Sequence, residues 1–355
     1  SAQSRWFQDY LQHGDASEYA DMFIRYSRFW PNAAPTDADL ARIYTRKPRP
    51  PFREVRTDDG ESERVWCTFD FEQIDLNLAS VSTREQMAEW LLSISRRGPA
   101  MIRLDAFAYV TKKAGTNCFF VEPDVWEILN WSREVLSGTD IELLPEVHEH
   151  YRMQQAIAEH GYRVYDFALP MLVLHALYES RADRLAHWLS VCPRSQITTL
   201  DTHDGIGVVD VADLLTPDEI ERTREALFEH GANVKRIYNT KAYGNLDIYQ
   251  INCTYFSALG ERDDWYLLAR ALQFFAPGIP QIYYVGLLAG RNDLALVEQT
   301  RVGRDINRHN YAVEEAVAEL RRPVVGSLLK LMHLRNQSRA FDGTMSVEAP
   351  GSNGE

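Results

Sequence analysis

The sequence predicts an α/β fold built as a (β/α)8 TIM barrel. Short apolar runs rich in β-branched residues alternate with segments of helical period, and polar residues gather where the apolar runs end. Strand, helix and strand in alternation form right-handed βαβ units around a parallel sheet. An open doubly wound sheet would need a Gly-rich phosphate turn after its first strand, and the sequence holds neither G-x-G-x-x-G nor a Walker sequence. A barrel, whose active site lies at the carboxyl ends of its strands, is therefore the better prediction.

The expected strands are apolar throughout, as is usual for strands that are covered on both faces of a parallel sheet. They are residues 99–107, 141–147, 162–169, 195–201 and 278–285. Apolar residues at helical spacing predict helices in the first intervals, at 83–97, 122–138 and 151–161.

Two further helices are predicted later in the chain. One begins after Thr216, a suitable N-cap, and stops at Gly231. The other covers residues 322–337. Residues 1–80 are rich in Pro, Arg and aromatic residues and do not follow the alternation, so we expect them to form a long excursion from the barrel. A second excursion is expected at 206–265.

The composition limits the classes of partner. With 38 basic and 51 acidic side chains the formal net charge is -13, which disfavours nonspecific binding to nucleic acid or anionic membranes. No stretch approaches the roughly 18–20 uninterrupted apolar residues of a membrane helix, and residues 1–12 lack the apolar core of a signal peptide. We therefore expect a cytoplasmic protein that binds neither nucleic acid nor membranes, with a homodimer left open.

The four cysteines are scattered along the chain and include no C-x-x-C pair. Neither a zinc site nor a disulfide framework is therefore predicted. The four are Cys67, Cys118, Cys192 and Cys253.

Acidic residues stand at the C-terminal ends of three of the predicted strands. Retaining glycoside chemistry needs a carboxylate nucleophile and a carboxylic acid that protonates the leaving group, and a third carboxylate can steady the substrate. Asp105, Glu146 and Asp204 stand where such groups are needed. Each acid alone could equally cap a helix or hold an arginine, so the prediction depends on the three together.

Several segments together resemble the α-amylase superfamily. They are EQIDLN (72–77), IRLDAFAY (102–109), LLPEVHEHY (143–151) and TTLDTHDGIG (198–207). Within that superfamily the sequence resembles the sucrose phosphorylase group of glycoside hydrolase family 13 over residues 5–345. The segments that carry this closer resemblance include AGTNCFF (114–120), YDFALPMLVLHALY (165–178), NLDIYQIN (245–252) and GRDINRHNY (303–311).

The resemblance implies a double displacement through a β-glucosyl ester. Asp105 would attack the anomeric carbon and Arg103 would orient it. Glu146 would protonate the departing oxygen and then assist the incoming acceptor. Asp204, with His203, would bind the glucosyl hydroxyl groups, and Asp201 would be structural.

Further substrate contacts are implied by the same resemblance. Arg304 or Arg308 would hold the far edge of the sugar, although either could simply pair with Asp305. Phe69 and Tyr109 would form an apolar wall, although Phe69 could belong to the core. The residues expected to face the acceptor are His148, Asp247 and Gln250. The family mechanism needs no metal or organic cofactor, and we expect none.

Two basic loops and Tyr249 give opposite indications about the acceptor. Arg46 and Lys47 in the stretch that begins at Tyr44 make a basic rim with Lys235, Arg236 and Lys241, which favours a phosphorylated acceptor, although these cations could simply be solvated. Tyr249 stands where the resemblance places a tyrosine in enzymes that act on plain sucrose.

We therefore expect sucrose 6F-phosphate, or sucrose, to react with inorganic phosphate to give α-glucose 1-phosphate and fructose 6-phosphate, or fructose. A plain sucrose phosphorylase, a glucosylglycerol phosphorylase, and a hydrolase or transglucosidase of the same fold stay open. A noncatalytic sugar-binding protein is disfavoured, because all three acids are present.

The resemblance also implies a domain organisation, that of an α-amylase-type barrel with inserted loop-rich subdomains and a C-terminal β-domain, of which this chain is expected to hold only barrel strands four to eight. The expected segments are a B-type subdomain (1–80), strands four to seven (81–205), a B′-type subdomain (206–265), strand eight with its helices (266–330) and the start of the β-domain (331–355).

Overall fold

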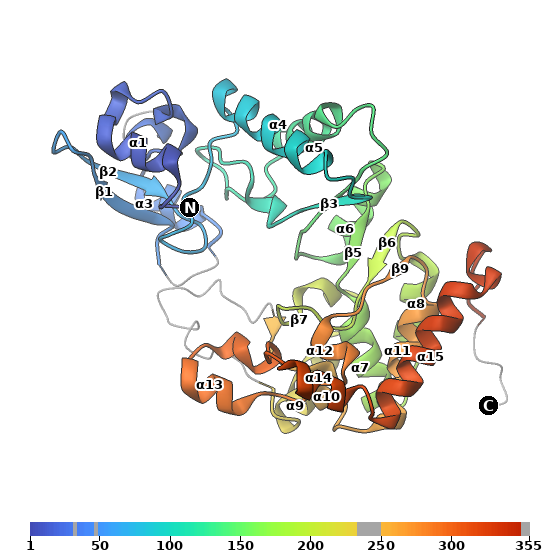
Figure 1. The fold of residues 1–355 in the computed structure, drawn as a ribbon. Coiled ribbons are helices and arrows are strands. Elements are labelled where there is room, and N and C mark those ends of the chain that lie inside the picture. Colours follow the sequence, from blue (N-terminus) through green and yellow to red (C-terminus); the bar gives the residue numbers. More distant parts are fainter. Residues whose placement is uncertain (31–33, 46–48, 233–249, 349–355) are drawn as a thin grey trace. The chain divides into compact units, whose positions relative to one another are not determined.

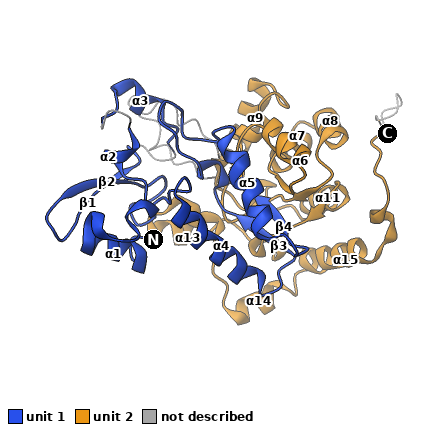
Figure 2. Cartoon of the chain, turned by 90° about the horizontal axis from the view of Figure 1, so that it is seen from above, with its two compact units in different colours: residues 1–146, 237–247 blue, residues 147–236, 248–355 orange. Residues whose placement is uncertain are grey.

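The computed structural model describes residues 1–30, 34–45, 49–232 and 250–348 (Figure 1). The described residues divide into two compact units, one from residue 1 to 146 and the other from residue 147 on (Figure 2). Among the described helices, none is long and apolar enough to cross a membrane.

The first unit contains an antiparallel strand pair and a parallel one. Its elements in order are α1 (Arg5–His13), η1 (Gly14–Ala16), η2 (Ala20–Met22), α2 (Tyr26–Phe29), α3 (Asp37–Arg42), β1 (Phe52–Arg56), β2 (Ser62–Trp66), α4 (Val81–Ser95), β3 (Met101–Leu104), η3 (Phe107–Tyr109), α5 (Asp124–Val135) and β4 (Glu142–Pro145). Strands β1 and β2 pair antiparallel, with Phe52 opposite Trp66. Strands β3 and β4 pair in parallel, with Leu104 opposite Pro145.

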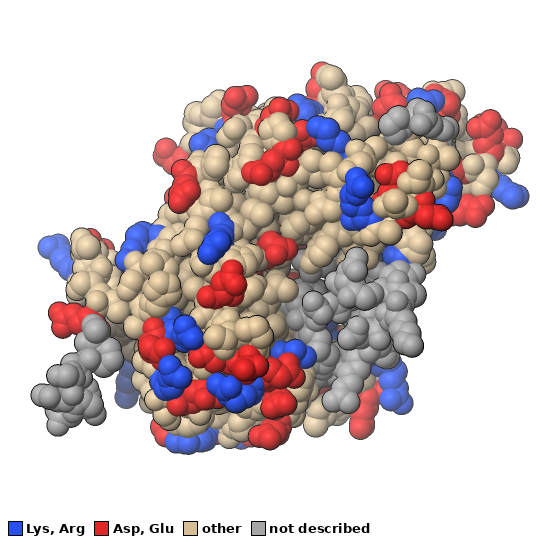
Figure 3. Space-filling model, turned by 180° about the vertical axis from the view of Figure 1, so that it is seen from behind, with Lys and Arg blue, Asp and Glu red and all other residues tan. Residues whose placement is uncertain are grey.

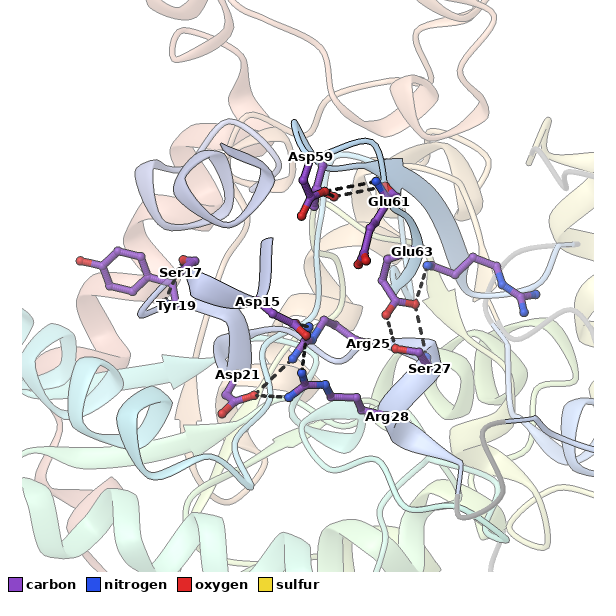
Figure 4. A network of polar contacts seen from close by, with 12 residues as sticks. Asp15, Ser17, Tyr19, Asp21, Arg25, Ser27, Arg28, Asp59, Glu61 and Glu63 are labelled. Carbon is purple, nitrogen blue, oxygen red and sulfur yellow. Dashed lines mark hydrogen bonds and ion pairs between the residues drawn. The ribbon is translucent and has the colours of Figure 1, made fainter. Parts of the chain in front are cut away.

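A network of charged side chains ties together the first turns of this unit (Figure 4). The Arg25 side chain is only 5% exposed and pairs with Asp15 and, at 3.4 Å, with Asp21. Arg28 pairs with the same two acids at 2.6 and 3.6 Å. The hydrogen bond from Arg25 lowers the pKa of Asp15 below its usual value. The network therefore links η1, η2 and α2 around one buried guanidinium.

The second unit contains a parallel three-stranded sheet, β5-β6-β9, and an antiparallel pair, β7-β8. Its elements in order are α6 (Tyr151–Glu159), β5 (Val164–Asp166), α7 (Leu169–Tyr178), α8 (Asp183–Val191), β6 (Gln196–Thr198), β7 (Ile206–Gly207), η4 (Val209–Val211), α9 (Pro217–Glu229), β8 (Gln250–Ile251), α10 (Tyr255–Ala258), α11 (Asp263–Phe275), β9 (Ile279–Pro280), α12 (Tyr284–Leu287), α13 (Leu294–Thr300), η6 (Gly303–Asn307), α14 (Val313–Glu319), α15 (Pro323–Gln337) and η7 (Arg339–Asp342).

The core of the second unit surrounds α7. All residues of this helix from Leu169 to His175 are buried, and α7 packs against α8, α9 and α11. A helix that is apolar on all sides is stable only where neighbours cover every face. Helix α7 is therefore a central element of this unit.

The predicted strands and helices are confirmed, with shorter strands than expected. The five predicted strands appear as β3, β4, β5, β6 and β9, all with parallel neighbours. The predicted helices appear as α4, α5, α6, α9 and α15. Thr216 caps α9 in a capping box with Glu219, and Gly231 follows its end at a φ of +80°.

Two of the expected segment boundaries lie within helices. The boundary at 266 falls inside α11, and the boundary at 331 falls inside α15.

All four cysteines are free and buried. Burial raises the pKa of Cys67, Cys192 and Cys253 to about 12, and it also raises the pKa of Cys118. Their thiols therefore stay protonated at neutral pH.

Candidate active site

Two carboxylates of the first unit meet on one arginine. The parallel register of β3 and β4 brings the residues that follow them side by side, so that Asp105 and Glu146 lie at neighbouring strand ends. Arg103, on β3, pairs through Nη1 with Oδ1 of Asp105 at 2.5 Å and through Nη2 with Oε1 of Glu146 at 2.7 Å. The expected contact between Arg103 and Asp105 is therefore present, and the guanidinium also holds Glu146.

The two acids differ in exposure. The side chain of Glu146 is 10% exposed, and its Oε2 accepts a hydrogen bond of 2.9 Å from the backbone N–H of Ala106. The side chain of Asp105 is 73% exposed. Glu146 is thus fixed at both oxygens, whereas Asp105 is held at one oxygen and otherwise open to solvent. One acid that is accessible and one that is enclosed suit attack and proton transfer respectively.

An aromatic group lies in the same unit. Phe69, which is half-buried, and Tyr109 contact edge to face with ring centroids 5.2 Å apart. Tyr44 stacks on Tyr109 with ring centroids 6.4 Å apart, and Phe119 packs against both Tyr44 and Tyr109. The structure therefore brings Phe69, Tyr109 and Tyr44 together, and such ring faces suit the C–H surfaces of a sugar.

Asp204 of the second unit is held by two arginines. It follows β6 by several residues, and its Oδ1 pairs with Nη1 of Arg304 at 3.2 Å and Nη2 of Arg308 at 3.4 Å. Arg308 Nε also donates to the backbone carbonyl of His203 at 2.7 Å. Nε2 of His203 lies 3.7 Å from Oδ2 of Asp204. Within the described residues, both arginines therefore form ion pairs with Asp204, and not with Asp305 as the alternative prediction had it.

Asp201, three residues before Asp204, has a different partner. Its Oδ2 pairs with Nη2 of Arg270 at 2.6 Å, and these side chains are 6% and 0% exposed. Burial alone would lower the pKa of Arg270, but the charges of Asp201 and Tyr266 raise it above its usual value. The expectation that Asp201 is structural is consistent with this buried pair.

Two residues of the segment GRDINRHNY that the sequence did not single out hold neighbouring parts of the second unit in place. Asn307 is buried and donates from Nδ2 to the carbonyls of Thr202 and Asp204 at 3.1 and 2.8 Å. His309 lies 2.5 Å from Asp293 through Nδ1 and 2.8 Å from Glu315 through Nε2. Asn307 fixes the backbone of Asp204, and the only sequence signal for either residue was its place beside the two arginines.

The charge on His309 is favoured by its partners. Burial alone would lower the pKa of His309, but the hydrogen bonds with Asp293 and Glu315 raise it above its ordinary value. Burial opposes ionisation of Asp293, yet the hydrogen bonds from His309 and from the backbone of Leu296 lower its pKa. Because Asp293 caps α13 and Glu315 caps α14, His309 joins the starts of both helices beside Arg308.

Two of the predicted acceptor residues come together in the second unit. Nε2 of Gln250 lies 3.1 Å from Nε2 of His148. The His148 ring stacks on Phe167 with centroids 3.7 Å apart. The other predicted acceptor and loop residues lie outside the described residues: Asp247, Tyr249, Arg46, Lys47, Lys235, Arg236 and Lys241.

Among the described residues, the face of the molecule drawn in Figure 3 carries no patch of acidic residues alone. Acidic and basic side chains are interspersed over the face drawn in Figure 3.

Comparisons with known proteins identify what this chain is similar to. No family model matches it. It is 53% identical over 352 residues to the sucrose phosphorylase of Streptococcus mutans serotype c. The matched region covers 99% of this chain and 73% of that protein. It matches the crystal structure of sucrose 6F-phosphate phosphorylase from Thermoanaerobacter thermosaccharolyticum with a TM-score of 0.93 and 42% identity, over 99% of this chain and 73% of that one.

The fold is also similar to that of the α-amylase from H. orenii, with a TM-score of 0.60 and 15% identity over 96% of this chain and 62% of that one. At this identity the likeness concerns the fold alone. These structural neighbours show a TIM-barrel-like α/β fold, as the alternation of strands and helices predicts.

Proposed function

We propose a reaction for this chain on the premise that it belongs to the sucrose phosphorylase family, whose members are glycosyltransferase-type phosphorylases of glycoside hydrolase family 13. The proposed reaction is retaining phosphorolysis of sucrose 6F-phosphate or sucrose. It yields α-glucose 1-phosphate and fructose 6-phosphate or fructose. The observation that carries this proposal is the bridge from Arg103 to both Asp105 and Glu146.

The bridge supports a nucleophile and an acid that act in sequence. In retaining enzymes the two carboxyl groups lie about 5–5.5 Å apart, because the nucleophile attacks the anomeric carbon directly and no water has to fit between them. A single guanidinium that contacts both groups is compatible with that short separation. We assign Asp105 as the nucleophile that forms the β-glucosyl ester, and Glu146 as the acid that protonates the leaving oxygen.

Glu146 would then act as a base. Once the fructosyl group has left, the Glu146 carboxylate takes a proton from the incoming phosphate. Attack by the phosphate oxygen breaks the bond between the glucosyl carbon and Asp105. Two inversions at the anomeric carbon give net retention, and thus the α-anomer of glucose 1-phosphate.

We assign Asp204 and its arginines to the glucosyl hydroxyl groups. Carboxylate and guanidinium groups form paired hydrogen bonds to neighbouring hydroxyls. The partial exposure of Arg304 and Arg308, 40% and 31%, leaves donors for a ligand while one acid holds both side chains. His203, at 52% exposure, is assigned to the same sugar.

The acceptor and the segment assignments are parts of the same proposal. His148 and Gln250 are assigned to the fructosyl side. We propose that β3, β4, β5, β6 and β9 correspond to barrel strands four to eight, with residues 1–80 and 206–265 as inserted subdomains and residues 331–355 as the start of a C-terminal β-domain. The cytoplasm is the proposed location, and a homodimer is left open.

The first test compares substrates. The full chain is incubated with inorganic phosphate and either sucrose or sucrose 6F-phosphate, and release of α-glucose 1-phosphate is measured. A tenfold preference for either sugar corresponds to about 1.4 kcal/mol in transition-state binding and identifies the acceptor. Release from neither sugar would refute the proposed reaction.

The second test concerns the nucleophile. The variant Asp105→Asn should lose at least about 10³-fold in turnover, because an amide cannot form the glucosyl ester. Its unfolding midpoint should stay near that of the parent, since the side chain is 73% exposed. Asp140→Asn, which alters an exposed acid of the same unit, is the matched control and should keep full activity. Retained turnover in Asp105→Asn would exclude Asp105 as nucleophile.

A further inference from the structure

A buried carboxylate close to His148 has no assigned role. Asp210 closes the segment THDGIGVVD, and the residue is 1% exposed. Among the described residues, neither of its carboxylate oxygens has a hydrogen-bond partner. Burying a carboxylate without donors costs several kcal/mol, so its charged or polar neighbours matter. Nδ1 of His148 lies 3.5 Å from Oδ2 of Asp210.

The chain places Asp210 and Gln250 through one strand pair. In the β7-β8 ladder Gly207 lies opposite Gln250, and Asp210 follows β7 in η4. A Cβ atom at position 207 would lie 2.1 Å from Oδ2 of Asp210. Only glycine therefore leaves room for this carboxylate, and the same ladder holds Gln250 on the other side of the imidazole.

The two neighbours together select one tautomer of His148. The Gln250 amide nitrogen can only donate, so Nε2 of His148, 3.1 Å away, must accept. The ring proton of the neutral imidazole then lies on Nδ1, the atom that faces Asp210. The stacked Phe167 ring, tilted by only 18°, fixes the plane in which both nitrogens lie.

We propose that Asp210 is a positioning residue that keeps the proton of His148 on Nδ1 and so presents the Nε2 lone pair to a hydroxyl group of the sugar acceptor. The hydroxyl takes the place of the Gln250 amide as the donor to Nε2. This role rests on the proposed function, because it concerns the acceptor side of the same reaction. It does not concern the glucosyl side, where Asp204 is the assigned acid.

The tautomer can be measured without turnover. In the full chain labelled with ¹⁵N-histidine, the His148 signals are identified by their loss in His148→Asn. The parent should show a protonated Nδ1 and an unprotonated Nε2, and Asp210→Asn should shift the ring toward a mixture of tautomers. Asp213→Asn is the matched control, because it removes the acid that lies 3.1 Å from the more exposed His150. A protonated Nε2 in the parent overturns the proposal, even if Asp210→Asn does not fold.

The kinetic test uses the reverse reaction. With α-glucose 1-phosphate as donor, Asp210→Asn should lower kcat/KM for fructose or fructose 6-phosphate about tenfold, since one oriented hydrogen bond is lost. The slow hydrolysis of the donor should change far less, because water needs no orientation by His148. In the His148→Asn background the Asp210→Asn substitution should cost nothing further.

The outcomes separate this inference from the proposed function. If Asp210→Asn lowers kcat/KM for the acceptor by the same factor in the parent and in the His148→Asn background, its role is structural and the inference is overturned. The predicted tautomer in a chain that transfers no glucosyl group would uphold the positioning of His148 and refute the function.

Discussion

Two aspartates three residues apart use arginine in opposite ways. The side chains of Asp201 and Arg270 are 6% and 0% exposed, so this ion pair is enclosed by the protein. Asp204 is 17% exposed, and its partners Arg304 and Arg308 are 40% and 31% exposed. The difference teaches that the burial of the partner indicates the role of an acid that follows a strand. An enclosed partner indicates a role in the fold, and partly exposed partners leave hydrogen-bond donors that a ligand can use.

Removal of the buried arginine should have the largest effect. Arg270→Met leaves Asp201 as an uncompensated buried charge, so the free energy of unfolding should fall by about 3–5 kcal/mol. Denaturation by urea measures this loss. The control Arg262→Met, which removes an exposed arginine that pairs with Asp264, should leave the free energy of unfolding almost unchanged. Equal losses in both variants would remove the distinction between enclosed and open pairs.

A substitution of Asp204, which pairs with the two partly exposed arginines, should change activity and leave stability almost unaffected. Asp204→Asn should lower turnover by about 10²–10³-fold, because a preorganised charge that favours the transition state is lost. Its unfolding midpoint should change little, since solvent reaches both arginines. Phosphorolysis rates and thermal unfolding of the same preparation test both statements, with Asp305→Asn as the control. Full activity in Asp204→Asn would contradict the assignment.

The smallest effect concerns the histidine next to Arg308. The pKa of His309 is raised, so its stabilising contribution is complete below its ordinary value of about 6.5 and is lost as pH rises through the raised value. The pKa of Asp293 is lowered, so its contribution is present above about 3.9 and is lost as pH falls through the lowered value. The pair should therefore stabilise the fold most between about pH 4 and 6.5.

Urea unfolding of the parent and His309→Gln at pH 6 and pH 9 tests this window. The difference between the two proteins should be no more than about 1 kcal/mol at pH 6, because the groups are partly exposed, and should approach zero at pH 9. The same difference at both pH values would mean that packing, and not charge, explains the role of His309.

Local patterns were sufficient for the five predicted strands, for the five predicted helices and for the acids at the strand ends. The runs around Arg103, Glu146 and Asp201 became strands because their apolar residues need cover on both faces, and the acids that follow them therefore lie at strand ends.

Long-range partners had no local signature. Asp201 and Arg270 are 69 residues apart, so nothing near either residue marks the pair. The same holds for His309 with Asp293, and for Asp210 with His148, whose placement depends on the β7-β8 register. The resemblance could already separate Asp201 from Asp204, whereas the arginines that pair with each acid could be identified only from the packed structure.

The four enclosed thiols make the chain suitable for selective conjugation. Maleimides and similar reagents react with thiolates, and burial keeps Cys67, Cys192 and Cys253 protonated with pKa values of about 12. A cysteine introduced at an exposed position such as Gln12, with an ordinary pKa of about 8.5, would react far faster. A single fluorophore could thus be attached without first replacing any native cysteine.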